Sequence, residues 1–383
     1  MKTRILKIAV VTSITVLSQA VQVTAQNAGN LLKAGEGNAN KLINAYLSST
    51  LDGIGQGIND GWNNTAKPLE LFGLDLRLNA GLGIVPTKDQ TFDFNSIAMR
   101  STDAKTYMVI QEGTNQNRPT IYGANEPNAA RVYVRSNIGG MDTALTSFTL
   151  PTGSGYSYSP SLPMLQMSVG LLKNTEVTLR YFPKTTIAQN YSLGLFGMAI
   201  KHDIMQWIPR FKNLMRDAKR PFDCSVFFGF TNFFAEYRKT LLAVDPLAYN
   251  PNPSFAYDNQ SITFNGNTWT AGIIASKEFR PFKPNITFTP YLGVNYSYSF
   301  VKFQFEGDYP IPVVNDQYSA VHPQVAKIER VTNPVSLESE VSTARINAGA
   351  RIKIYTFTIS GEYSIGKINT VTIGLGLNLQ SLK

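Results

Sequence analysis

The sequence is poor in the residues that build disulfides, metal centres and catalytic sites. Its 383 residues include one cysteine, Cys224, and two histidines, His202 and His322. A single cysteine excludes an intramolecular disulfide, and so few cysteines and histidines exclude a Cys/His metal cluster. Neither histidine accompanies a nucleophile motif such as Gly-x-Ser-x-Gly. We therefore expect no catalytic residues, no metal and no cofactor.

Long hydrophobic runs are also missing, and this excludes a protein that crosses a membrane with helices. The one continuous apolar run, at 8–17, follows Lys2, Arg4 and Lys7 and leads to small residues ending at Ala25. A basic start, a short apolar run and a small-residue end are typical of a cleaved secretory signal. The sequence therefore predicts a signal peptide over 1–25, cleaved after Ala25, and a mature chain that starts at Gln26.

Dense clusters of basic residues are absent as well. The formal net charge is +9, and it falls to +6 without residues 1–25, which hold three basic residues and no acidic ones. A mildly basic, exported chain without Lys/Arg clusters is not typical of nucleic-acid binding. We expect no nucleic-acid partner.

What the sequence does contain is apolar and polar residues in strict alternation. The clearest examples are 72–84, 286–305, 345–354 and the closing pair 357–365 and 371–379. A period of two predicts strands with one apolar and one polar face. Several of these strands have ten or more residues, which is longer than usual in soluble sheets. With the export signal, the pattern predicts an all-β fold: a transmembrane antiparallel β-barrel over 71–383, in contact with lipid in the outer membrane of a Gram-negative bacterium.

The connections divide into short turns and long loops, as outer-membrane barrels require. The tight ones are 173–176 and 366–369, whereas 113–131, 241–260 and 307–335 are long and unpatterned. We expect the tight turns on the periplasmic side and the long loops outside. Counting alternating segments gives about twelve strands. The region 92–150 could add two more, so we predict about 14 strands, with 12 as the alternative.

Residues 26–70 differ from the rest because their apolar residues recur at near-helical spacing, interrupted by glycines. This predicts short interrupted helices that form an N-terminal hatch inside the lumen of the barrel. The residues that could line a path past the hatch are Leu47, Leu51, Ile54, Trp62 and Lys67. Trp62 could instead be a packing residue between hatch and wall.

Charged residues at the polar positions of the strands should face the lumen, because a charge facing lipid at mid-membrane costs about 2 to 4 kcal/mol. These luminal candidates are Asp75, Arg77, Arg345, Arg351 and Glu362. We expect them to form a network that tethers the hatch.

One connection has the spacing of a basic amphipathic helix near Pro209. Its members include Trp207, Ile208, Arg210, Phe211 and Arg216. We expect this helix to lie on the periplasmic side, against the inner-leaflet headgroups or the barrel rim.

Two segments resemble known families. The first, Gly57-Ile58-Asn59-Asp60-Gly61-Trp62 and onward to Pro68, with the strand after it, resembles an uncharacterised family of Bacteroidota outer-membrane β-barrels over nearly the whole mature chain. The second, from Gly197 to Pro209, is similar to a segment shared by that family and the type 9 secretion shuttle protein PorV. Both are distantly similar to the long-chain fatty-acid transporter FadL. The resemblance implies a fourteen-stranded barrel with an N-terminal hatch.

Two functions remain open from the sequence. The first is a passive channel for small hydrophobic compounds, gated by the hatch. The alternative is a non-transporting adaptor barrel that binds a secreted or surface protein through its long loops, since aromatic residues are enriched at interfaces. The loop aromatics are Tyr249, Phe255, Tyr257, Tyr309 and Tyr318.

Overall fold

The computed structural model describes most of the chain. It covers residues 30–98, 106–126, 129–138, 140–187, 190–208, 220–240, 257, 259–280, 285–315 and 326–380. The predicted signal peptide and its cleavage site lie outside these residues. None of the described helices is long and apolar enough to cross a membrane.

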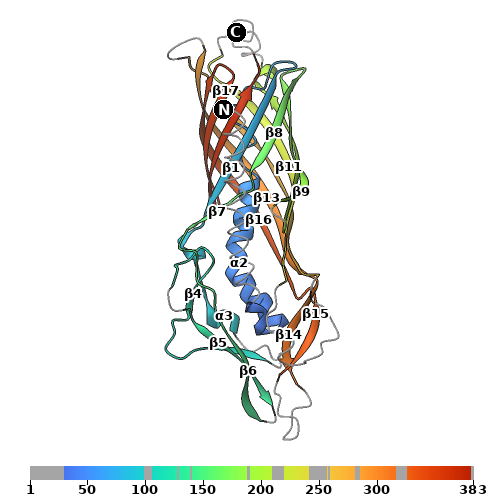
Figure 1. Cartoon of the computed structure of the whole chain (residues 1–383). Coiled ribbons are helices and arrows are strands. Elements are labelled where there is room, and N and C mark those ends of the chain that lie inside the picture. The colour runs from blue at the N-terminus through green and yellow to red at the C-terminus, as the bar shows by residue number, and fades with distance from the viewer. Residues whose placement is uncertain are drawn as a thin grey trace.

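The main element is a closed antiparallel barrel (Figure 1). In the described part of the chain it has ten strands: β1 (Leu74–Ile84), β8 (Met164–Leu171), β9 (Thr175–Ile187), β10 (Tyr191–Asp203), β11 (Asp223–Arg238), β12 (Ser261–Ser276), β13 (Ile286–Glu306), β16 (Val335–Ile354), β17 (Phe357–Ile365) and β18 (Asn369–Asn378). The first and last strands close the ring, with pairs from Asp75↔Asn378 to Ile84↔Asn369.

The prediction of an antiparallel barrel is confirmed, but the predicted count of 14 or 12 strands is wrong. The described strands of the region 92–150 lie outside the barrel and form separate small sheets. Alternation with a period of two reports a half-buried strand, and it does not report which sheet the strand belongs to. Strands outside the barrel therefore had the same signature as strands within it.

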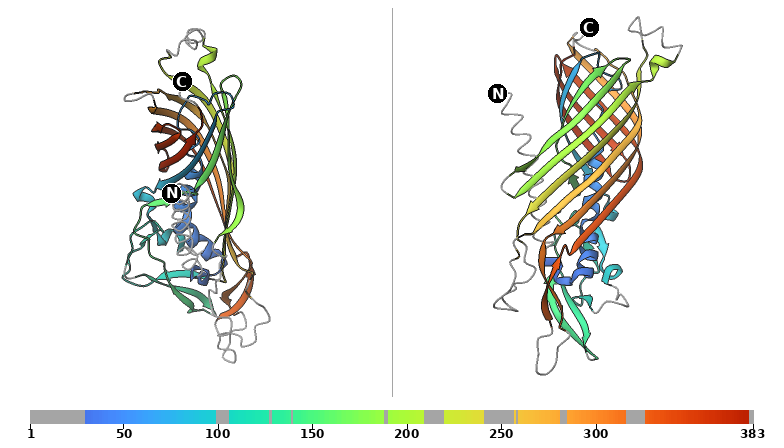
Figure 2. Two further views of the ribbon diagram at one scale, coloured as in Figure 1. Left: turned by 45° about the horizontal axis from the view of Figure 1, so that its top comes forward. Right: turned by 90° about the vertical axis from the view of Figure 1, so that its right-hand side faces the viewer.

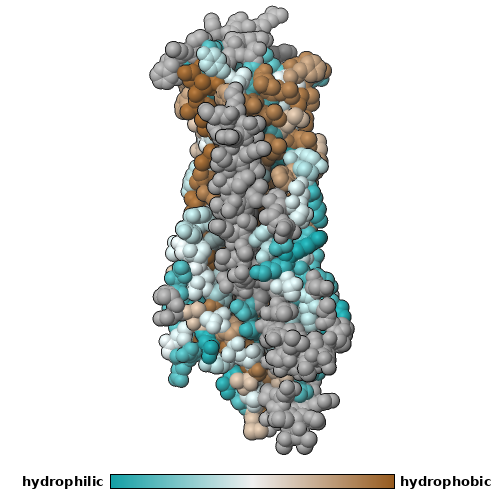
Figure 3. All heavy atoms as spheres, in the orientation of Figure 1, coloured by the Kyte–Doolittle hydropathy of each residue, from teal (hydrophilic) through white to brown (hydrophobic). Residues whose placement is uncertain are grey.

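The outward surface of the barrel carries an apolar band, visible in the upper half of Figure 3. On β13 the outward Leu292, Val294 and Tyr296 are exposed, whereas the inward Asn295 and Ser297 are buried. This arrangement is the reverse of a soluble protein and is typical of a barrel in a bilayer.

Beyond the band the two faces of the same sheet exchange polarity. From Val301 onward the inward residues Val301, Phe303 and Phe305 are apolar and fully buried, and the outward Lys302 and Gln304 are polar. β13 and β16, with 21 and 20 residues, are long enough to continue past the band. The sheet therefore extends from a membrane barrel into a water-exposed half-barrel with an apolar interior.

This half-barrel and the long insertions form what we call the head, at the lower end in Figures 1 and 2. The strands of the head outside the main ring are β2 (Thr91–Asp93), β3 (Tyr107–Ile110), β4 (Asn117–Pro119), β5 (Arg131–Ile138), β6 (Met141–Thr149), β7 (Tyr158–Pro160), β14 (Asp308–Val314) and β15 (Ala326–Thr332). Its short helices are η1 (Leu32–Ala34), η2 (Thr87–Asp89) and α3 (Phe94–Ala98). β14 pairs with β15, β2 with β4, β5 with both β3 and β6, and β7 with the end of β1.

We call the opposite end of the barrel the base, where β1 begins at Leu74 and β18 ends at Asn378. The strand registers place the tight turn before Thr175 at the base and the tight turn between Ile365 and Asn369 at the head end. The prediction that both tight turns share one side is therefore wrong. Turn length follows the height of each strand pair, and β17 and β18 are short strands that end where the bilayer band ends.

The helix α2 (Glu36–Ile58) runs from the head into the barrel, along the axis in Figure 1. It is continuous, so the predicted interruption at its glycines is wrong. A Cβ atom on Gly53 or Gly57 would lie 2.7 or 2.6 Å from the Cβ of Ser159 or Ser161, and one on Gly55 would lie 2.7 Å from Ser299 Oγ. The glycines serve close packing between two walls, which offsets their cost of about 1 kcal/mol each in a helix.

Candidate functional site

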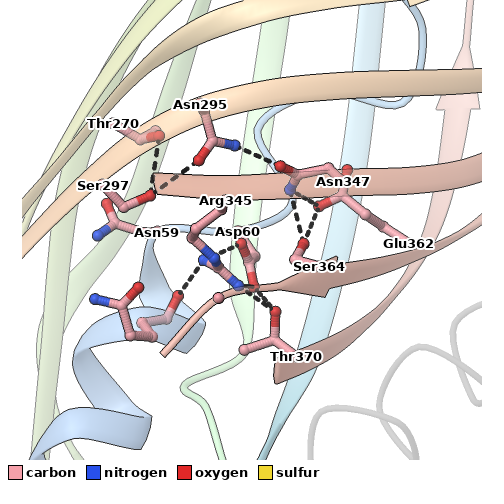
Figure 4. Close-up of polar contacts among 12 residues, drawn as sticks. Asn59, Asp60, Thr270, Asn295, Ser297, Arg345, Asn347, Glu362, Ser364 and Thr370 are labelled. Atoms are coloured by element: carbon pink, nitrogen blue, oxygen red, sulfur yellow. Dashed lines mark hydrogen bonds and ion pairs between the residues drawn. The ribbon is translucent and has the colours of Figure 1, made fainter. Parts of the chain in front are cut away.

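The candidate site is the stretch of chain that fills the barrel, residues 56–69, which we call the luminal segment. It begins in the last turn of α2 and leads to β1 at the base. Figure 4 shows the contacts around its acidic residue, Asp60, in the barrel interior.

Arg345 holds the end of α2 from one side. Its guanidinium donates to both oxygens of Asp60, at 2.6 and 3.0 Å, and to the Gln56 carbonyl at 3.3 Å. The Thr370 hydroxyl donates to the same carboxylate. Arg345 and Asp60 are both fully buried. A cation at a helix C-terminus also interacts favourably with the helix dipole.

Arg180 holds the same region from the other side. It donates to the carbonyls of Ile58 at 2.8 Å and Asp60 at 2.5 Å, and its guanidinium lies 3.5 Å from the centre of the Trp62 ring. Trp62 packs so tightly on the wall that a Cβ on Gly229 would lie 2.6 Å from the indole. The Trp62 side chain thus packs the luminal segment against the wall, in contact with Arg180 and Gly229.

Further along, the wall contacts one carbonyl after another. Arg77 donates to the Trp62 carbonyl at 3.0 Å, and Asn79 donates to the Gly61 carbonyl at 2.9 Å. Lys201 donates to the Thr65 carbonyl at 3.2 Å and forms an ion pair with Glu176 at 3.1 Å. Backbone carbonyls that would be unsatisfied in a dry lumen are thereby bonded to the barrel.

Asp75, Arg77, Arg345 and Arg351 are buried and Glu362 is half-buried, and their contacts fall into separate groups. Asp75 pairs with Arg77 at 2.9 Å, and Arg345 pairs with Asp60. Arg351 approaches Glu278 at 4.0 Å, and Glu362 accepts a hydrogen bond from Asn347 at 3.3 Å. Of these five residues, Arg77 and Arg345 form hydrogen bonds with the luminal segment.

Sequence reasoning missed Asp60, Arg180, Lys201 and Glu176. Asp60 stands in a loop-like stretch that has no period, so nothing indicated its direction. Arg180, Lys201 and Glu176 occupy polar positions of β9 and β10, and the argument that assigned Arg77 to the lumen would have found them.

A small cavity lies beside the luminal segment. A cavity of about 20 Å³ is bordered by Asp60, Trp62, Asn295, Asn347 and Glu362, among others. A water molecule needs about 10 to 15 Å³ measured in this way. This cavity therefore has room for a water molecule and not for a hydrophobic ligand.

The predicted apolar hatch residues lie elsewhere. Leu47 and Leu51 are fully buried in the head, in one cluster with Phe303 and Phe305, and Ile54 is half-buried against it. Lys67 is exposed, and its backbone N–H donates to Thr65 Oγ1. These residues do not line a common path.

At the base, the predicted amphipathic helix is described only at its start. Trp207, at the end of the short helix η3 (Met205–Trp207), and Ile208 are exposed, and the Trp207 indole donates to His202 Nε2 at 2.9 Å. Arg210, Phe211, Arg216 and His322 lie outside the described residues.

The fold and the luminal segment define a class: a closed antiparallel β-barrel of ten described strands whose interior is occupied by its own N-terminal segment. Within that class, the chain belongs to the Family of unknown function (DUF6588), whose model matches residues 1–379. No curated protein matches the chain.

Three of the solved structures with some similarity to the chain are remote from it in sequence. One is Ail, the attachment invasion locus protein of Yersinia pestis, in complex with the heparin analogue sucrose octasulfate, at 9% identity, 80% of this chain, 98% of that chain and a TM-score of 0.21. Another is the translocator domain of autotransporter NalP from Neisseria meningitidis. It is 9% identical, the match covers 81% of this chain and 88% of that chain, and the TM-score is 0.28. A third is the transport unit of the autotransporter AIDA-I from Escherichia coli. It is 9% identical, the match covers 90% of this chain and 99% of that chain, and the TM-score is 0.26. These similarities do not support a specific relationship to FadL or PorV, nor an origin in Bacteroidota.

Proposed function

We propose that this protein is an outer-membrane anchor that holds the head outside the cell, and that its lumen stays closed. In this proposal the head binds a secreted or surface macromolecule, as the adaptor interpretation of the sequence predicts. The orientation follows the rule that the longer loops of such barrels face outward.

The observation that carries the proposal is the double role of α2. Its first half supplies Leu42, Ile43 and Leu47 to the core of the head, and its last turn is bonded to Arg180 and Arg345 in the lumen. Moving α2 to open a pore would expose core side chains, each worth about 1.5 to 3 kcal/mol when buried. We therefore infer that α2 stabilises the fold and does not act as a gate.

The alternative, a passive channel for small hydrophobic compounds, has less support. At the level of the apolar band, many inward side chains are polar, for example Gln166, Thr178, Thr270 and Thr289, and the inward apolar residues Ile274 and Tyr291 form only a small cluster. An apolar solute gains nothing from displacing water there, and it would have to replace hydrogen bonds that it cannot make.

The experiment measures conductance and uptake with the purified full-length protein. Intact protein in planar bilayers should be silent. A variant in which residues 59–66 become a glycine–serine segment of equal length should conduct ions, because the side chains that fill the lumen are gone while α2 and β1 keep their connection. The variant must still show heat-dependent migration in gels, which reports a folded barrel.

The channel interpretation makes the opposite prediction. Vesicles containing the intact protein should then take up a fluorescent fatty acid faster than empty vesicles do. Faster uptake, or steady conductance of the intact protein, would refute the closed anchor.

A further inference from the structure

One edge of β16 is unpaired in the head. On one side β16 pairs with β13 from Val335 to Ile354. On the other side it pairs with β17 only from Ile346 to Ile354. Within the described part of the chain, no strand pairs with this second edge from Val335 to Arg345. An open strand edge is a template for another strand.

A side chain already imitates a partner strand at the beginning of this edge. Asn40 of α2 donates from Nδ2 to the Pro334 carbonyl at 2.9 Å and accepts from the Ser336 N–H at 3.1 Å. A residue in a neighbouring strand makes the same pair of bonds with its backbone. These contacts also show which way the backbone groups point.

Backbone groups alternate sides along a strand, and the β13–β16 register has no shift. Alternate residues from Glu338 to Ala344 therefore direct N–H and C=O groups toward the open edge, as Ser336 does. Their side chains are exposed. Within the described residues, one side chain bonds to these backbone groups: Thr343 Oγ1 donates to the Ala344 carbonyl at 3.1 Å.

An open groove lies beside the start of this edge. It has a volume of about 410 Å³ between α2 and the entry to β16, and it is lined by Glu36, Asn40, Lys41, Asn44, Asn333, Pro334, Ser336 and Leu337. Six of these eight residues have polar or charged side chains. Acidic side chains, Glu338 and Glu340, then follow on the outward face of the edge, with Lys302 3.4 Å from Glu338.

We propose that this edge binds an extended peptide segment of a partner protein as an added antiparallel strand. The inference rests on the proposed function, because it requires the head to be outside and free. The partner strand carries lysine or arginine at the alternate positions that face Glu338 and Glu340, and small polar residues at the positions that face α2. Backbone bonds supply affinity and the two carboxylates supply selectivity.

A second copy of this chain fits the edge less well. Two β16 edges paired antiparallel around Glu340 would bring like charges opposite each other, which is destabilising. We therefore commit to a basic peptide as the occupant.

The experiment uses full-length protein in detergent and a fluorescent, end-capped octapeptide of alternating lysine and threonine. We expect saturable binding by fluorescence anisotropy. Replacing the lysines with glutamates should weaken binding at least tenfold. Methylating the backbone nitrogen of every second residue, in two peptides that cover both frames, should weaken binding at least tenfold in at least one frame.

Two variants of the protein locate the site. Ser342→Pro removes an N–H from the open edge and leaves the ladder with β13 intact, since proline is tolerated where the N–H faces away from a partner strand. It should weaken binding at least tenfold, whereas Ser342→Ala should change it less than twofold. Both variants must migrate as folded barrels.

Several outcomes would overturn the inference. These are absence of binding, binding that is unaffected by Ser342→Pro or by backbone methylation in both frames, and a dimer of the protein that Ser342→Pro dissolves. Failure here with a silent intact protein leaves the closed anchor standing. Conductance by the intact protein refutes the anchor whatever the peptide does.

Discussion

Asp60 and Arg345 form a buried ion pair in which each group depends on the other. Their side chains are 1% and 0% exposed, so neither can be hydrated alone. Removing one partner of such a pair leaves an uncompensated buried charge, which typically costs about 3 to 5 kcal/mol. Replacing both partners by apolar residues costs much less.

We therefore predict that Asp60→Ala strongly lowers the temperature at which the folded gel band converts to the unfolded band. The double variant Asp60→Ala/Arg345→Met should recover much of that loss. If the double variant is as unstable as the single one, the pair is not what holds the luminal segment.

For single residues, the sequence predicted which side chains face the lumen, but it did not predict which residues pair with each other. The period of two assigned Arg77 and Arg345 to the inward face because that face is a property of each strand alone. The partner of Arg345, Asp60, is 285 residues away in sequence and lies in a stretch without period. Only the closed fold brings the two together.

The glycines of α2 stand at two kinds of position, some packed closely against the barrel and some open to solvent. A Cβ on Gly57 would lie 2.6 Å from Ser161 Cβ, whereas a Cβ on Gly37 would meet no atom within 4 Å. We predict that Gly57→Ala lowers the free energy of unfolding by about 1 to 3 kcal/mol, as overpacking does. Gly37→Ala, the matched control, should raise it by about 0.5 to 1 kcal/mol. Urea unfolding followed by tryptophan fluorescence measures both.

The hairpin β14–β15 has an acid-sensitive anchor. Hydrogen bonds from Arg330, and then from the Thr332 hydroxyl at 2.6 Å and the Asn259 amide at 3.2 Å, lower the pKa of Asp308 to about 2. An unfolded aspartate has a pKa of about 3.9. Because the pKa of Asp308 is lower in the folded state, its hydrogen bonds stabilise the hairpin fully at pH values above the unfolded pKa. This stabilisation is lost as the pH falls through the folded pKa, toward pH 2.

Pepsin, which is active across this range, can test the anchor. We predict that β14 and β15 resist cleavage within the strands at pH 4 and are cleaved there at pH 2. Asp308→Asn should already be cleaved at pH 4. Equal resistance of both proteins at both pH values would contradict an acid-sensitive anchor.

For the elements, alternation predicted strands well and their assembly poorly. β1, β13, β16, β17 and β18 all fall where a period of two was found. The continuity of α2 was missed because glycine opposes helix locally, and only contact with Ser159, Ser161 and Ser299 reverses that preference. The strand count failed because the small sheets of the head, formed within 92–150, have the same period as the strands of the barrel.

For the whole molecule, the path of the chain predicts which parts are accessible from outside the cell. Asn30 is exposed at the head end, where Leu31 and Leu32 enter the core of the head, whereas Leu172 is exposed at the base. In a Cys224→Ala background, Asn30→Cys should react with a large, impermeant maleimide on intact cells. Leu172→Cys should react only after the outer membrane is opened. The reverse pattern would show that the barrel has the opposite orientation.

The passage of α2 through the barrel also constrains the order of assembly. Residues 31 and 32 are locked in the head, residue 74 begins the wall at the base, and the chain between them runs through a ring closed by β1 and β18. If the ring closed first, the N-terminal end of α2, which carries Leu42 and Tyr46, would have to pass through the ring from the base to the head. We therefore expect the pairing between β1 and β18 to form last, after α2 and the luminal segment are in place.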